Sequence, residues 1–166
     1  MTASGAAPVA SSRYELLAAI AEFHAAYAQC IDDDQLEYWP GFFVEHCLYR
    51  IIPRENADRE LPAAIMYCDS KGMLVDRIVA LRKANIYPAH YSRHIIGTPL
   101  LQHTNGEIIR AQTNYVVLQT REGETRIFNA GKYVDEMTWV DGALKLRQRS
   151  CVFDTHQIDT LLVTPI

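Results

Sequence analysis

Residues 107–154 read EIIRAQTNYVVLQTREGETRIFNAGKYVDEMTWVDGALKLRQRSCVFD. Two turn signals, Glu122-Gly123 and Asp141-Gly142, divide the stretch into runs rich in Ile, Val, Tyr, Thr and Phe. Such dipeptides between β-branched and aromatic runs are typical of hairpins. With a further run over 92–103, which ends before Asn105-Gly106, the stretch predicts an antiparallel meander over 92–103, 107–120, 125–140 and 143–154.

The first half of the chain has helical periodicity instead. Residues 11–31 carry apolar side chains at steps of three and four, which predicts an amphipathic helix: Leu16, Ile20, Phe23, Tyr27 and Ile31. Ser11 or Ser12 could cap it, and Glu15, three residues after Ser12, has the spacing of a capping box. Residues 70–85 predict another helix, which Pro88 ends because its ring cannot continue the hydrogen-bond ladder.

Between these helices we expect a short helix, two strands and a loop. Asp34 and Glu37 have the spacing of a capping box for a short helix, although a carboxylate cluster can also be catalytic. Strands are expected over 45–53 and 61–69, with a polar loop over 54–60. Helices followed by a large curved sheet indicate an α+β fold with the helices on one side of the sheet.

Length and termini indicate one domain. The 166 residues suit one core, so we expect a mobile tail over 1–12 and a single α+β domain over 13–166. The first twelve residues lack the basic start and apolar centre of a secretory signal, which favours the cytoplasm.

Charge and apolar runs exclude two classes of partner. The net charge is −4, and no basic stripe interleaves with aromatic residues, so nucleic acid is not expected as a partner. No apolar run reaches the roughly 20 residues that cross a bilayer, so no membrane is expected. The four cysteines are scattered and are interpreted as buried free thiols.

His90 and His94 lie four residues apart, which on a helix would suit a zinc site. Pro88 precedes them and Gly97-Thr98-Pro99 follows, so the segment is interpreted as a loop entering a strand. In a strand, residues four apart lie roughly 13 Å apart, too far to share one ion. His103 is nine residues further on without a recognisable spacing, so no metal is expected.

Other cofactor motifs are also missing from the sequence. There is no C-x-H paired with C-x-x-H for an iron–sulfur cluster, and no recognisable two-histidine, one-carboxylate set for mononuclear iron. Glycine-rich nucleotide-binding patterns are absent. We therefore expect no cofactor in this chain.

Three segments carry a family resemblance: HAAYAQCIDDDQLEYWPGFFVEHCLYRI, DSKGMLVDRIVALRKANIYPAHYSRHIIG and DTLLVTPI. Together they resemble the small (β) subunit of aromatic-ring-hydroxylating oxygenases over residues 14–166. The most specific parts are D-S-K-G-M-L-x-D-R-I and R-H-I-I-G. Within the family, the chain is most similar to subunits that serve aromatic acids such as terephthalate or salicylate.

The resemblance implies a cone-like, strongly curved, mostly antiparallel sheet, as in nuclear transport factor 2 and ketosteroid isomerase. It also implies a partner, a large α subunit that holds the Rieske [2Fe-2S] cluster and the mononuclear iron. An α3β3 assembly with β self-association is expected, with β as a structural subunit. Whether the reaction inserts one oxygen atom or two is not implied.

Subunit contacts are expected on the loop 54–60, the helix start 69–77 and the loop 86–94. Arg77, Tyr91 and Arg93 are the side chains expected there, since arginine and tyrosine make large, directed contacts. Ordinary surface positions or ion pairs within the chain are the alternative. Family members often read Y-R-H where this chain has Tyr91-Ser92-Arg93-His94, which leaves the local register open.

A standalone small dehydratase or isomerase of the same fold is the alternative function. Five side chains could line its pocket: Asp34, His24, Tyr49, His90 and His94. A base in an apolar cone would have a shifted pKa and could abstract a proton. The alternative is that His24 is a partly buried neighbour of Phe23 and that His94 is a hydrogen-bonded strand or interface residue.

Overall fold

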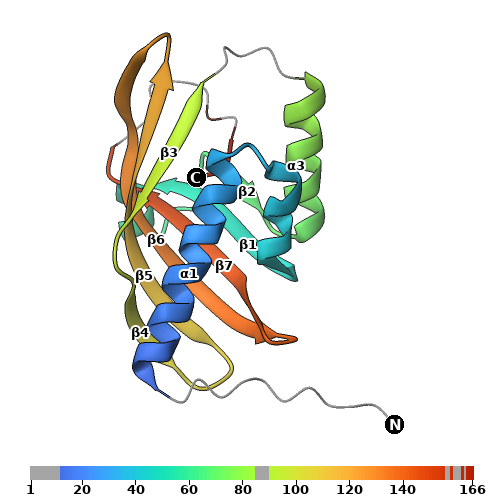
Figure 1. Cartoon of the computed structure of the whole chain (residues 1–166), viewed down its shortest axis with the longest axis vertical. Coiled ribbons are helices and arrows are strands. Elements are labelled where there is room, and N and C mark those ends of the chain that lie inside the picture. The colour runs from blue at the N-terminus through green and yellow to red at the C-terminus, as the bar shows by residue number, and fades with distance from the viewer. Residues whose placement is uncertain (1–11, 85–89, 156–157, 159–161, 163) are drawn as a thin grey trace.

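A curled, unclosed sheet forms the body of the molecule, and a long helix lies across its inner face (Figure 1). The computed structural model describes residues 12–84, 90–155, 158, 162 and 164–166. The expected tail over 1–12 lies outside these residues, except for Ser12.

Three helical segments precede or interrupt the first strands. Helix α1 spans Arg13–Asp32, a 3-10 helix η1 spans Leu36–Phe42, and α2 spans Arg54–Asp58. Helix α3 spans Lys71–Ala84. Ser12 and Glu15 form the predicted capping box of α1, with side-chain bonds in both directions. The polar loop expected over 54–60 is wrong in part, because its first five residues form α2.

The strands are β1 (Phe43–Pro53), β2 (Met66–Cys68), β3 (Tyr91–Ile96), β4 (Leu100–Thr104), β5 (Ile109–Arg121), β6 (Glu124–Val140) and β7 (Ala143–Phe153). Their order is β2-β1-β7-β6-β5-β3, and β4 also pairs with β5. The predicted meander is confirmed for β5, β6 and β7. The run expected over 92–103 is two strands, because the chain leaves the sheet at residues 97–99.

One pairing departs from the antiparallel pattern. Strand β1 pairs in parallel with β7, for example Ile51 with Cys151, while the other pairs are antiparallel. This pairing joins the first strand to the last. The strand expected over 61–69 is reduced to the three residues of β2, which form one edge of the sheet.

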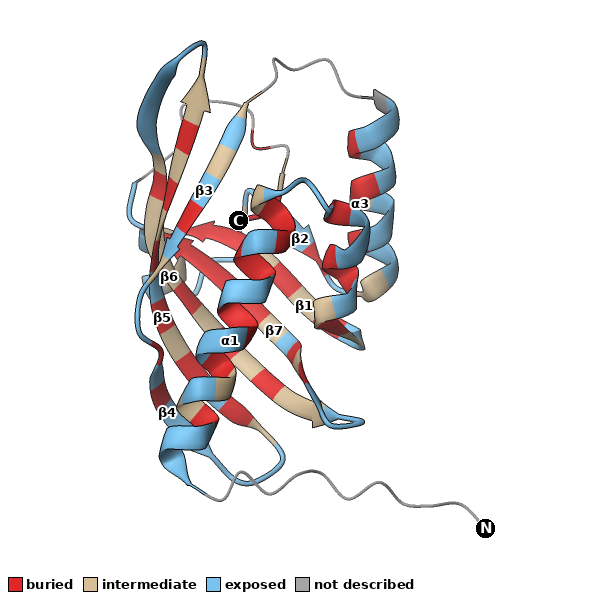
Figure 2. Ribbon diagram, in the orientation of Figure 1, coloured by how far each residue is buried: buried red, intermediate tan, exposed pale blue. Residues whose placement is uncertain are grey.

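The core lies between α1 and the inner face of the sheet. Figure 2 shows the buried residues of α1 turned toward the strands and the exposed ones turned away. Ile20 and Tyr27 of α1, Trp39 of η1 and Tyr133 of β6 are fully buried there. Among the described residues, no helix is both long enough and apolar enough to cross a bilayer.

The short helix begins differently from the prediction. Asp34 has a φ of 56° and does not cap η1, whose N-cap is Gln35 without a side-chain bond. The carboxylates of Asp34 and Glu37 instead bind Arg82 of α3, at 2.8 and 2.7 Å. The expected capping box is therefore wrong, because an arginine distant in sequence takes both carboxylates.

Candidate functional site

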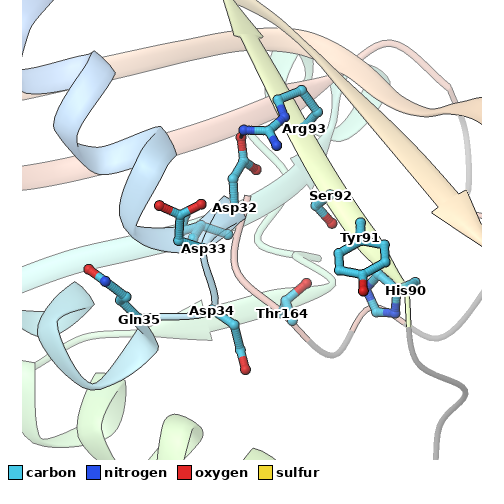
Figure 3. Close-up of a pocket in the computed structure, with 10 residues that line it drawn as sticks. Asp32, Asp33, Asp34, Gln35, His90, Tyr91, Ser92, Arg93 and Thr164 are labelled. Atoms are coloured by element: carbon cyan, nitrogen blue, oxygen red, sulfur yellow. Dashed lines mark ion pairs between the residues drawn. The ribbon is translucent and has the colours of Figure 1, made fainter.

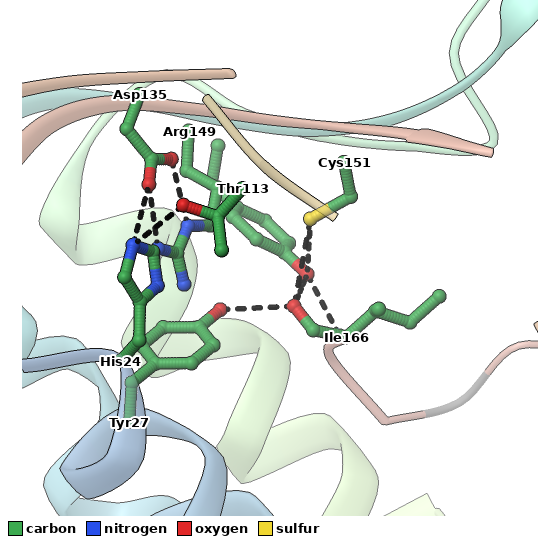
Figure 4. Close-up of polar contacts among 8 residues, drawn as sticks. His24, Tyr27, Thr113, Asp135, Arg149, Cys151 and Ile166 are labelled. Carbon is green, nitrogen blue, oxygen red and sulfur yellow. Dashed lines mark hydrogen bonds and ion pairs between the residues drawn. The ribbon is translucent and has the colours of Figure 1, made fainter. Parts of the chain in front are cut away.

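The inner face of the sheet holds a buried ion pair (Figure 4). Arg149 of β7 donates from Nε to Asp135 Oδ1 at 2.9 Å and from Nη2 to Oδ2 at 2.7 Å. Both side chains are 0% exposed. Burial raises the pKa of Asp135, and the charge and hydrogen bonds of Arg149 oppose that rise. Burial lowers the pKa of Arg149, but the Asp135 carboxylate more than offsets this and holds it well above its ordinary value.

Two tyrosine rings enclose the guanidinium of Arg149. Its central carbon lies 4.1 Å from the ring centroid of Tyr27 and 4.0 Å from that of Tyr133. These contacts place a cation against the electron-rich faces of two aromatic rings, which stabilises a charge removed from water. Burial raises the pKa of both phenols, so Tyr27 and Tyr133 remain protonated.

His24 of α1 is also part of this cluster and contacts both members of the ion pair. Its Nδ1 lies 3.0 Å from Arg149 Nη2, which can only donate, so Nδ1 accepts and Nε2 carries the proton. Nε2 lies 3.3 Å from Thr113 Oγ1 and 3.6 Å from Asp135 Oδ2. Burial and the positive charge of Arg149 lower the pKa of His24 to about 2, so the ring is neutral.

A second group of polar contacts surrounds the main-chain oxygen of Ile166. The hydroxyls of Tyr27 and Tyr49 each donate to it at 3.1 Å, and Cys151 Sγ lies 3.5 Å away. The N–H of Ile166 donates to the Tyr49 hydroxyl at 2.9 Å. Burial raises the pKa of Cys151 to about 12, so the sulfur remains a thiol.

These buried groups are hydrogen-bonded to one another and to the backbone. His24 is 1% exposed and Tyr49 is 0% exposed, so solvent reaches neither side chain in this state. The lone pair of His24 Nδ1 already accepts from Arg149, and Tyr49 already binds Ile166. A general base must come within hydrogen-bond reach of the proton that it abstracts, and in this structure both groups are within that reach of other protein groups.

Two of the predicted site residues lie elsewhere, beside an open depression of about 740 Å³ (Figure 3). The end of α1 and the following turn form one side of it, with Asp32, Asp33 and Asp34. The start of β3 forms the other side, with His90 and Tyr91. Asp34 and His90 therefore line the same depression, while His24 and Tyr49 lie in the core.

His94 is tied to the end of α1. Its Nδ1 lies 2.6 Å from Asp32 Oδ1, and its backbone N–H donates to Asp32 Oδ2 at 2.8 Å. Within the described residues, no three His, Cys, Asp or Glu side chains gather in a way that could hold a metal ion. The described side chains around His94 therefore do not match the ligand sets that bind iron or zinc. His94 is a hydrogen-bonded strand residue, which was one of the two alternatives for it.

The expected subunit-contact residues have mixed surroundings. Tyr91 is 78% exposed. Arg93 is exposed, with its Nη1 3.9 Å from Asp32 Oδ2, and Arg77 donates to the backbone oxygen of Leu162 at 3.1 Å. Residues 86–89 of the expected contact loop lie outside the described residues. Contacts with another subunit stay a prediction for all three side chains.

Arg149 and Asp135 were not predicted from the sequence. In β6 the buried positions alternate as Tyr133, Asp135 and Met137, so the strand period itself places a carboxylate on the inner face. Arg149 shares its face with Cys151 and Phe153 in the same way. The available signal for this buried pair was the alternation on each strand, which puts one charged residue on the same face as buried apolar residues.

The family follows from comparison with known proteins. A family model described as "Ring hydroxylating beta subunit" matches residues 26–160. The chain belongs to this family. It is 45% identical over 148 residues to the terephthalate 1,2-dioxygenase terminal oxygenase component subunit beta 2 of Comamonas sp, which covers 89% of this chain and 96% of that protein. It is 44% identical to the anthranilate 1,2-dioxygenase small subunit of Burkholderia cepacia, over 84% of this chain and 88% of that one.

A solved structure gives the same result. A Novosphingobium aromaticivorans protein, described as the beta subunit of an aromatic-ring-hydroxylating dioxygenase, superposes with a TM-score of 0.84 at 55% identity, covering 91% of this chain and 97% of that one. The expected α+β fold, the family and the likeness to a subunit that serves terephthalate are confirmed. A likeness to a salicylate-serving subunit stays a prediction.

Proposed function

We propose that this chain is a structural β subunit of a ring-hydroxylating oxygenase and that the chemistry takes place on a partner α subunit. The family match over residues 26–160 carries this proposal. The role fits a chain whose buried histidine, tyrosines and ion pair are already bonded to one another. The standalone dehydratase or isomerase is not favoured, because relatives at about 45% identity are oxygenase subunits.

The substrate class in this proposal is an aromatic acid. The two relatives named above serve terephthalate and anthranilate, both aromatic carboxylic acids. Since the substrate would bind to α, residues of this chain would affect the reaction by holding α in place. We place the complex in the cytoplasm, with an α3β3 composition.

The cofactors of this proposal, a Rieske [2Fe-2S] cluster and mononuclear iron, belong to α. The four cysteines here are buried free thiols, and burial raises the pKa values of all four. A metal-binding cysteine requires the thiolate, which burial disfavours. Ring hydroxylation needs an activated form of dioxygen and a supply of electrons, which metal centres provide.

Co-expression with a large subunit tests this assignment. The chain is produced with and without an α subunit from a related terephthalate or anthranilate oxygenase, and each sample is analysed by sedimentation and for iron. We expect the chain to copurify with α at equal stoichiometry and to contain no stoichiometric iron when purified alone. About one iron or zinc per isolated chain, lost in a His94→Ala variant, would contradict the proposal.

Whether the isolated chain already forms trimers is a separate question that sedimentation equilibrium answers. A trimer at tens of micromolar chain is the expected result. A strict monomer that forms α3β3 only with α present would correct the assembly order and leave the subunit role intact.

A further inference from the structure

Five buried side-chain polar atoms lack a hydrogen-bond partner among the described residues, and two of them belong to residues of one row of the sheet. These two are His94 Nε2 on β3 and Asn129 Nδ2 on β6. His94 is 7% exposed and Asn129 is 4% exposed. Buried polar side-chain atoms in native proteins are nearly always bonded to protein or to ordered water, so a pair of unbonded atoms calls for a physical explanation.

The sheet register places these two residues in one row. His94 is paired with Val117 of β5, and Val117 is paired with Asn129. All three are buried, so they share the inner face. Two strand spacings separate the Cα atoms of His94 and Asn129 by roughly 10 Å. Val117, with its short side chain, lies between two longer polar side chains.

The hydrogen bonds that His94 and Asn129 already make limit what their two unbonded atoms can bind. His94 Nδ1 lies 2.6 Å from the Asp32 carboxylate and donates to it, which leaves Nε2 without a bond. Tyr115 donates its hydroxyl to Asn129 Oδ1 at 2.6 Å, so Nδ2 of that amide is a free donor. The row therefore presents two polar atoms without a partner among the described residues, on either side of Val117.

We propose that a hydroxyl group binds in a gap between these two side chains, where it accepts from Asn129 Nδ2 and is hydrogen-bonded to His94 Nε2. The ligand is uncharged: either water, directly or as a short chain, or the hydroxyl of a small alcohol or phenol. An anion is disfavoured because the Asp32 carboxylate is hydrogen-bonded to the same imidazole. The site does not depend on the proposed subunit role, since it rests on this chain's own contacts.

A high-resolution crystal structure of the full chain tests the site, with one crystal untreated and another soaked in phenol. Density within hydrogen-bond distance of both His94 Nε2 and Asn129 Nδ2 in both crystals, unchanged by phenol, supports a water site. A phenol oxygen at that position supports a site that takes organic hydroxyls. An empty gap, or an Asn129 amide turned so that Nδ2 meets a protein acceptor, overturns the proposal.

A variant pair tests the same site in solution. Val117→Ile adds a methyl group to the gap, whereas Val116→Ile adds one to the neighbouring residue on the opposite face of β5. If Val117→Ile displaces a bound hydroxyl, the urea midpoint of unfolding falls, and the side-chain amide NMR signals of Asn129 shift. Val116→Ile leaves both unchanged. Equal midpoints and unshifted Asn129 signals in the two variants would count against an occupied gap.

Discussion

Arg149 and Asp135 are joined by hydrogen bonds of 2.9 and 2.7 Å although both side chains are fully buried. The guanidinium of Arg149 lies between the rings of Tyr27 and Tyr133, and His24 is hydrogen-bonded to it. Removing one partner of a buried pair leaves the other charge uncompensated, whereas replacing both by apolar groups can be nearly neutral. The stability of the fold therefore depends on keeping the pair intact.

Asp135→Asn should lower the free energy of unfolding by about 3–5 kcal/mol, because it leaves the Arg149 charge unpaired in the core. The matched control is Glu136→Gln, the next residue, whose carboxylate pairs with the exposed Arg110 at 2.8 Å. That exposed pair should contribute at most about 1 kcal/mol. Urea unfolding measures both, and equal losses for the two variants would contradict the buried-pair account.

Stability should fall with acid below about pH 6.5 because of His24. The folded state lowers the pKa of His24 from 6.5 to about 2, so between these values the unfolded chain binds the extra proton. The stability from neutral His24 is complete above pH 6.5 and is lost as the pH falls. One such group gives a slope of up to about 1.4 kcal/mol per pH unit, or about 2 kcal/mol from pH 6.5 to 5.

A His24→Asn variant identifies the source of that slope. Asparagine keeps an acceptor near Arg149 but does not titrate, so the dependence between about pH 7 and 5 should flatten. His46→Asn, at an exposed position of β1, should keep the wild-type slope. Urea unfolding at several pH values measures this, and the same slope in all three proteins would rule out His24 as its source.

Two tyrosines should respond oppositely to loss of the hydroxyl. Tyr49→Phe removes the partner of the Ile166 N–H and one of the donors to the Ile166 oxygen, and should cost about 1–3 kcal/mol. The Tyr133 hydroxyl has no partner among the described residues, so Tyr133→Phe should be neutral or slightly stabilising. Thermal and urea unfolding compare the two. A loss at Tyr133 as large as that at Tyr49 would mean that its hydroxyl is bonded after all.

Gly131 should tolerate no side chain. A Cβ there would lie 2.1 Å from the Val152 oxygen and 2.7 Å from Phe153 Cα, because the backbones of the paired strands β6 and β7 approach closely at this position. Gly131→Ala should therefore cost about 1–3 kcal/mol or more. Gly41→Ala, with nothing within 4 Å of its Cβ, is the control and should change stability by about 0.5 kcal/mol or less. Equal urea midpoints for the two variants would refute the close approach.

Local signals in the sequence were sufficient for much of the fold. Ser12 and Glu15 capped α1 as predicted, and Glu122-Gly123 and Asp141-Gly142 formed the turns of the meander with positive φ at every position. The Asp34–Glu37 capping box failed because Arg82, 45 residues beyond Glu37, competes for both carboxylates. Contacts over such distances are not encoded in local spacing.

The site was less predictable than the fold for the same reason. Asp135 and Arg149 were not among the predicted site residues, and each stands beside other polar residues in the sequence. Their burial follows from pairing two strands and from the rings of α1 and β6 that close over them. His94 was considered with His90, but its actual partner, Asp32, lies 62 residues away on α1.

Turnover per α iron in assembled complexes tests the structural role most directly. The complex is made with wild-type chain and with His24→Asn, Asp34→Asn or His94→Ala, and only fully assembled material is assayed. If the chain acts by holding α in place, each assembled variant should keep most of the wild-type turnover, with losses confined to the yield of complex. A fully assembled variant whose turnover falls by ~100-fold, about 2.7 kcal/mol of transition-state stabilisation, would contradict the structural role.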